Sequence, residues 1–137
     1  MAGKPLNRIL MVEDEPDIQT IARLALEAVG GYEVEICDSG TEALEVAPVW
    51  APDLVMLDVM MPGIDGRTTL MKLRELPEMT STPVIFMTAK VQPQEVALYK
   101  SLGALDVVAK PFDPMTLADT VKAIWDGHSG GSEEHYA

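Results

Sequence analysis

Three acidic residues, one hydroxyl group and one ammonium group follow four short apolar runs that lie far apart along the chain. They are Glu13, Asp14, Asp58, Thr88 and Lys110. Taken singly, each has an ordinary explanation, because acids suit the N-terminus of a helix and isolated polar residues cap loops or face solvent. If the apolar runs are neighbouring parallel strands, however, their carboxyl ends meet at one edge of a sheet. All five groups would then converge there.

Such a cluster of acids would suit a hard divalent cation. Neighbouring carboxylates raise each other's pKa unless a cation relieves the repulsion. Mg2+ prefers oxygen ligands and is commonly held by one or two carboxylates with phosphate oxygens, so Asp14 and Asp58 could hold it with Glu13 nearby. A carboxylate beside Mg2+ can attack phosphorus and form an aspartyl phosphate. Lys110 and the Thr88 hydroxyl are suited to neutralising the transferring oxygens.

The elements that must position these groups alternate between strands and helices. Strands are predicted at residues 8–13, 33–37, 54–57, 84–87 and 106–109. Helices are predicted from Pro16 to Gly30, from Ser39 with Glu42 at capping-box spacing, at 68–76, at 93–102, and from Asp113-Pro114 to about Asp126. Mostly apolar strands that alternate with helices imply a parallel sheet covered on both faces. The expected fold is α/β, a five-stranded doubly wound sheet with five helices.

Length and composition restrict the functional classes. The 137 residues are enough for one core and too few for two ordinary domains; a domain is expected at 6–126 and a flexible tail at 127–137. No apolar run approaches the roughly 20 residues of a membrane span, and the N-terminus lacks a secretory signal pattern. Cys37 is the single cysteine, so a cytoplasmic protein without membrane partners is expected. The net charge of −12 argues against direct nucleic-acid binding.

Four segments, in order along the chain, resemble the motifs of bacterial response-regulator receiver domains. They are Val12-Glu13-Asp14-Glu15, Leu57-Asp58-Val59-Met60-Met61-Pro62-Gly63-Ile64-Asp65-Gly66, Met87-Thr88-Ala89 and Ala109-Lys110-Pro111-Phe112. The likeness covers residues 6–126. Within the family, the chain resembles the single-domain regulators of chemotaxis. It implies a flavodoxin-like fold with strand order 2-1-3-4-5.

The resemblance also implies a phosphoacceptor site. Asp58 would accept a phosphoryl group from a phosphohistidine on a sensor histidine kinase or a phosphotransfer protein. Glu13, Asp14, Asp58 and the backbone carbonyl of Met60 would form the Mg2+ site. The chain would then be a signalling domain of a two-component system, and not an enzyme acting on external substrates. It would signal by changing its binding to a downstream protein that the sequence does not name.

By the same resemblance, Thr88, Lys110 and Ala89 would bind the phosphoryl group. Lys110 would pair with it, the Thr88 hydroxyl would shift to hydrogen-bond it, and the Ala89 backbone amide would donate to it. The Lys110-Pro111 peptide bond is often cis in this family. One departure is Val107, which stands where receivers commonly carry an aromatic residue coupled to the threonine. The resemblance therefore does not imply an aromatic rotamer switch here.

Three alternatives to a stand-alone phosphoacceptor stay open on the sequence. The chain could be a receiver excised from a larger regulator or a hybrid histidine kinase. It could be a magnesium phosphohydrolase with an aspartyl nucleophile, although Met60 stands where haloacid-dehalogenase-like enzymes usually carry a second aspartate. It could be a phosphorylation-independent binding domain, against which the intact acids, Thr88 and Lys110 argue. A phosphorylation-dependent homodimer formed through the last helices is also left open.

Overall fold

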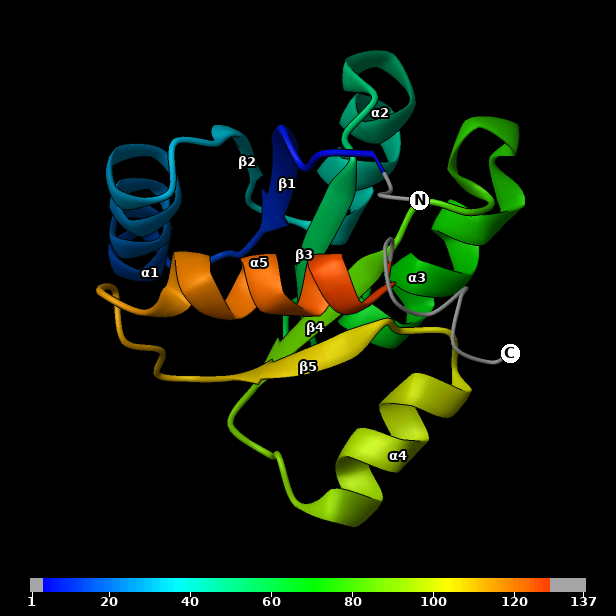
Figure 1. The fold of residues 1–137 in the computed structure, drawn as a ribbon. Helices are drawn as coiled ribbons and strands as arrows, with labels where there is room; N and C mark the ends of the chain where they lie inside the picture. Colours follow the sequence, from blue (N-terminus) through cyan, green and yellow to red (C-terminus); the bar gives the residue numbers. More distant parts are fainter. Residues whose placement is uncertain (1–3, 129–137) are drawn as a thin grey trace.

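Five parallel strands form the central sheet, in the order β2-β1-β3-β4-β5, in the computed structural model, which describes residues 4–128 (Figure 1). The strands are β1 Arg8–Val12, β2 Glu33–Cys37, β3 Leu54–Asp58, β4 Val84–Thr88 and β5 Asp106–Ala109. Their bounds agree within one residue with those predicted from the apolar runs. The predicted fold class and strand order are thereby confirmed.

The helices are α1 Pro16–Arg23, α2 Gly40–Trp50, α3 Gly66–Glu75, α4 Pro93–Ser101 and α5 Leu117–Asp126. Two short segments accompany them, a π-helical turn over Leu24–Val29 that continues α1 and a 3-10 turn over Pro77–Met79 after α3. In Figure 1, α5 lies across the near face of the sheet. Each of the first four strands is followed by a helix that returns the chain for the next parallel strand.

The sheet has one hydrophobic cluster on each face, and the two clusters contain side chains of different helices. Alternate strand residues point to opposite faces, so that Ile9 and Met11 of β1 belong to one cluster and Leu10 and Val12 to the other. The first cluster contains apolar side chains of α1, its π-helical continuation and α5, and the second contains side chains of α2, α3 and α4. Strands β3 and β4 are buried along their whole length. This explains why both read as continuous apolar runs.

Two helices begin at residues other than those predicted. Helix α3 begins at Gly66 instead of residue 68, because the Asp65 carboxylate caps it by accepting a hydrogen bond from the Thr68 amide at 2.8 Å. Helix α5 begins at Leu117, whereas the sequence favoured Asp113-Pro114. Asp113 caps a separate turn instead, since its Oδ1 atom accepts from the Met115 amide at 2.9 Å.

Of the predicted tail, Gly127 and His128 are described, and 129–137 lie outside the described residues. The domain boundary at residue 126 therefore stays a prediction.

Candidate metal centre

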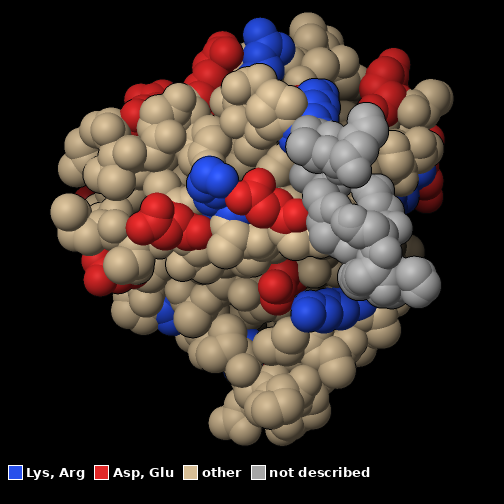
Figure 2. Space-filling model, in the orientation of Figure 1, with Lys and Arg blue, Asp and Glu red and all other residues tan. Residues whose placement is uncertain are grey.

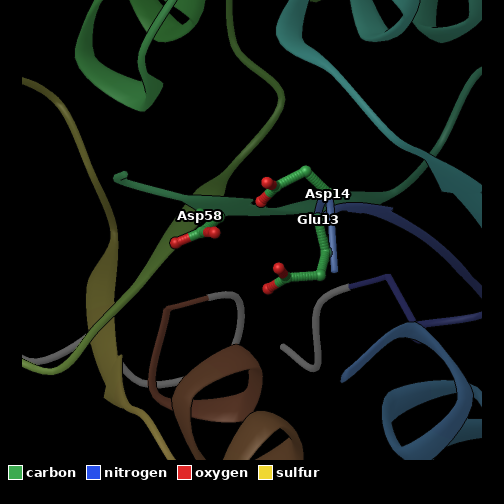
Figure 3. A group of neighbouring side chains, drawn as sticks. All are labelled: Glu13, Asp14 and Asp58. Atoms are coloured by element: carbon green, nitrogen blue, oxygen red, sulfur yellow. The ribbon is translucent and has the colours of Figure 1, made fainter. Parts of the chain in front are cut away.

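Three carboxylates converge at the edge of the sheet where the strands end. Glu13 and Asp14 directly follow β1, and Asp58 is the last residue of β3, which pairs with β1. One oxygen of each carboxylate lies within 4.8 Å of the others. Figure 3 shows the carboxylates of Asp14 and Asp58 directed toward a shared space that Glu13 also lines. This all-oxygen donor set fits a hard cation such as Mg2+.

Burial makes this cluster costly unless its charges are relieved. Glu13 has no exposed surface and Asp58 is 3% exposed, whereas Asp14 is half-buried. The ammonium of Lys110, which follows β5, lies 2.9 Å from Glu13 Oε1 and 3.3 Å from Asp58 Oδ2. Its side chain is 15% exposed. Sequence reasoning paired Lys110 with a phosphoryl group, and its bridge between two acids was not foreseen.

The acids and the lysine shift one another's proton affinity. Burial raises the pKa of Glu13 above its ordinary value, in spite of the opposing hydrogen bonds from Lys110 and the Glu15 amide. Burial likewise raises the pKa of Asp58, against the charge and hydrogen bond of Lys110. For Lys110 burial lowers the pKa, but the hydrogen bond to Glu13 and the two negative charges outweigh it, so that its pKa is raised. A second cation would favour the ionised acids.

The conformation of the loop after Asp58 depends on Gly66, a glycine for which the sequence predicted no role. A Cβ atom at Gly66 would lie 2.4 Å from the Asp58 carbonyl oxygen and 2.8 Å from the Val59 Cα atom. The Gly66 amide donates to the Val59 carbonyl at 2.9 Å. Helix α3 therefore approaches the Asp58 backbone more closely than any side chain would allow. A glycine at the first position of a helix, directly after its capping residue, is the sequence signal for such an approach.

Met60 lies two residues after Asp58 on the same loop. Its backbone amide lies 3.4 Å from Asp58 Oδ1, and its side chain is 73% exposed. The predicted ligand is its carbonyl group. That assignment stays a prediction.

Thr88 and Ala89 lie at the end of β4, beside Asp58. Thr88 is buried, and its hydroxyl oxygen accepts a hydrogen bond from the Lys90 amide at 3.1 Å. The Lys110 amide donates to the Thr88 carbonyl at 2.9 Å, which ties the two strand ends together. Ala89 is exposed at the start of the following loop. The predicted phosphoryl-binding groups thus border the acids, although Thr88 is not hydrogen-bonded to any of them in the described structure.

The neighbourhood of Val107 contains aromatic side chains on other elements. Val107 of β5 is half-buried and packs against the cluster that includes Phe86 and Tyr99. The rings of Phe86 and Tyr99 meet edge to face, with centroids 5.2 Å apart. Tyr99 is buried, so it contributes to packing.

The peptide bond between Lys110 and Pro111 is cis.

On the face shown in Figure 2, over α5, acidic and basic side chains are interspersed and no continuous basic area is present. None of the helices in residues 4–128 is both long enough and apolar enough to cross a membrane.

A sequence model of the response regulator receiver domain family matches residues 9–122. Among curated proteins, the chain is 40% identical over 117 residues to the alkaline phosphatase synthesis transcriptional regulatory protein PhoP of Bacillus subtilis, covering 85% of this chain and 48% of that protein. It is 35% identical to the transcriptional regulatory protein CseB of Streptomyces coelicolor, covering 91% and 53%. The chain thus spans about half the length of the curated relatives it matches.

A solved structure with the same arrangement is that of the Vibrio cholerae chemotaxis protein CheY4. It is 30% identical, with a TM-score of 0.80 over 88% of this chain and 99% of that one.

Proposed function

This chain belongs to the response regulator receiver domain family of two-component systems, and we propose that Asp58 is its phosphoacceptor. One observation carries this assignment. The Lys110 ammonium lies between Glu13 and Asp58, while Asp14 completes a pocket of three convergent carboxylates. Buried acids that meet a partly buried cation at the carboxyl ends of parallel strands are arranged for chemistry with a charged ligand.

The proposed reaction moves a phosphoryl group from a phosphohistidine of a sensor histidine kinase or phosphotransfer protein to Asp58. A carboxylate oxygen of Asp58 attacks phosphorus, the phosphorus–nitrogen bond breaks, and the imidazole leaves. Mg2+, held by Glu13, Asp14, Asp58 and the Met60 carbonyl, would neutralise charge on the transferring oxygens. Lys110, already 3.3 Å from Asp58 Oδ2, would pair with the same oxygens.

Thr88 and Ala89 supply the remaining donors. The Thr88 hydroxyl oxygen accepts from the Lys90 amide, and its proton is still available, since a hydroxyl group can donate once while it accepts. Ala89, an exposed residue, comes directly after Thr88 in the chain and would contribute its backbone amide. Phosphorylation of Asp58 would thus draw the start of the β4–α4 loop toward the site. This movement would change the surface offered to a downstream protein and does not need an aromatic residue at Val107.

Intact-protein mass spectrometry after incubation with acetyl phosphate and Mg2+ tests the proposal. We expect an adduct of one phosphoryl group per chain, lost in Asp58→Ala and in a metal-chelated sample. Asp38→Ala is a control in which an exposed acid outside the pocket is removed. An adduct that persists in Asp58→Ala would contradict the assignment of Asp58.

We propose further that the chain is not a phosphatase for external substrates and acts in the cytoplasm. Its only turnover would be the gain and loss of its own phosphoryl group. With p-nitrophenyl phosphate, nitrophenol beyond the first equivalent per chain should appear only at the slow rate at which phosphorylated Asp58 loses its phosphoryl group. Rapid multiple turnover that depends on Asp58 would favour the phosphohydrolase instead.

A second candidate places the same receiver in a longer regulator. The observation that favours it is length, because the chain covers 48% and 53% of two transcriptional regulatory proteins. A further similar structure, 34% identical with a TM-score of 0.74, is the receiver domain of a signal transduction histidine kinase from Syntrophus aciditrophicus. The mass of the native protein in its cells, measured by immunoblotting, separates the two candidates. A mass near 14.9 kDa supports the stand-alone regulator, and a larger mass supports the longer one.

A further inference from the structure

Asp14 is the one acid of the pocket whose carboxylate has no side-chain anchor. Lys110 holds both Glu13 and Asp58, and the Glu15 amide also donates to Glu13 Oε2 at 3.1 Å. By contrast, the Asp14 carboxylate makes no hydrogen bond or ion pair within residues 4–128. The position of the Asp14 carboxylate therefore depends on the backbone that carries it and on its side-chain rotamer.

The backbone just before Asp14 is held by the side chain of Gln19. Gln19 Nε2 donates a hydrogen bond to the Glu13 carbonyl oxygen at 2.6 Å. Glu13 is fully buried, and no backbone amide of the described residues donates to that oxygen. The Glu13 carbonyl and the Asp14 amide belong to one planar peptide unit. A hydrogen bond to this oxygen thus fixes the plane from which Asp14 projects.

Gln19 is itself placed by secondary structure. It is the fourth residue of α1, and its amide donates to the Glu15 carbonyl at 3.0 Å. Its side chain is half-buried. The helix therefore presents the amide group to the end of β1 from a fixed position, and the contact links α1 to the loop that carries both acids.

We propose that Gln19 is a positioning residue of the acidic pocket, which orients the Glu13–Asp14 peptide so that the Asp14 carboxylate points at the metal position. The inference rests on the proposed function for its metal. Gln19 would touch neither Mg2+ nor the phosphoryl group and would act through Glu13 and Asp14. Loss of such an outer partner typically weakens metal binding by roughly 10- to 100-fold.

Two substitutions of Gln19 separate this role from simple electrostatics. Gln19→Met keeps the length and helix propensity of the side chain and removes the donor. Gln19→Glu keeps the shape, removes the donor and adds a negative charge, which by itself would tighten Mg2+ binding. Thr20→Ala is the matched control, because within residues 4–128 the Thr20 hydroxyl bonds only to the Pro16 carbonyl of its own helix.

The Mg2+ dissociation constant of the full chain, measured by isothermal titration calorimetry, gives the first result. We expect it to rise about tenfold in Gln19→Met, to rise in Gln19→Glu in spite of the added charge, and to stay unchanged in Thr20→Ala. Unchanged binding in Gln19→Met together with tighter binding in Gln19→Glu would overturn the proposal. If Gln19→Met does not fold, Gln19→Glu decides alone.

Amide hydrogen exchange of the metal-free protein gives the second result. The Glu15 amide, which bonds to the Glu13 carboxylate, should exchange faster in both Gln19 variants than in the wild type, while strand amides stay protected. Equal exchange of the Glu15 amide in all proteins would refute the positioning role. If the wild type itself binds no Mg2+, the proposed function fails, and hydrogen exchange still tests the hold of Gln19 on this loop.

Discussion

Replacement of Lys110 by methionine should destabilise the metal-free protein, because it leaves two buried acids without their cation. The Lys110 ammonium lies 2.9 Å from Glu13 and 3.3 Å from Asp58. At an effective dielectric constant near 20, each contact is worth about 5 kcal/mol before the cost of removing the charges from water. Breaking a buried ion pair from one side costs about 3–5 kcal/mol in net terms. Since the acids can take up protons, we expect the free energy of unfolding to fall by an amount near the lower end of this range, about 3 kcal/mol.

The loss should depend on pH in a defined direction. Burial raises the pKa values of Glu13 and Asp58 above their ordinary values of 4.5 and 3.8. A folded state whose carboxyl groups have raised pKa values binds protons more readily than the unfolded state, so that these groups favour folding at low pH and lose that contribution as pH rises through the folded pKa values. Without Lys110 these pKa values rise further. The deficit of Lys110→Met should therefore shrink as pH falls from neutral toward about 5.

Urea unfolding in a metal chelator, followed by circular dichroism at neutral pH and at about pH 5, measures both effects. Lys100→Met is the control, because Lys100 is half exposed and lies 3.7 Å from Asp106; exposed pairs of this kind contribute at most about 1 kcal/mol. A deficit of Lys110→Met no larger than that of Lys100→Met, or one that grows as pH falls, would refute the electrostatic reasoning.

Three further predictions concern stability and reactivity. Gly66→Ala should destabilise the protein by about 1–3 kcal/mol, because its Cβ atom would meet the Asp58 backbone. Gly127→Ala, whose Cβ atom would meet no further atom of residues 4–128 within 4 Å, should be neutral or slightly stabilising in thermal unfolding. Asp53→Ala should cost about 2 kcal/mol in urea unfolding, since its carboxylate accepts hydrogen bonds from two amides at the start of β1. Cys37 is buried with its pKa raised to about 12, so Ellman's reagent should label it only after unfolding, and rapid labelling of the native protein would contradict this.

Much of the fold followed from the sequence because β3 and β4 are buried on both faces. Residues 54–57 and 84–87 were identified as strands from their apolar character, and both lie in the sheet. Helix starts were less accurate, because Asp65 and Asp113 are both good capping residues. Only the tertiary structure shows that Asp65 caps a helix, whereas Asp113 caps a preceding turn.

The sequence predicted which residues meet at the candidate site better than it predicted the contacts between them. The rule that ligands lie at the ends of parallel strands placed Glu13, Asp14 and Asp58 together. That rule does not specify which oxygen faces which nitrogen, so the bridge made by Lys110 was missed. The Gln19 contact was missed for a related reason, because a single polar residue on a helix carries no periodic signal that distinguishes a solvent-facing amide from one bonded to a buried carbonyl.

The most direct test of the central claim is to locate the phosphoryl group. Borohydride reduces an aspartyl phosphate to homoserine, and peptide mapping then identifies the residue that was modified. After treatment with acetyl phosphate and Mg2+, we predict homoserine at position 58 alone, and none when the metal is chelated. Homoserine at position 14, or at another aspartate, would contradict the account.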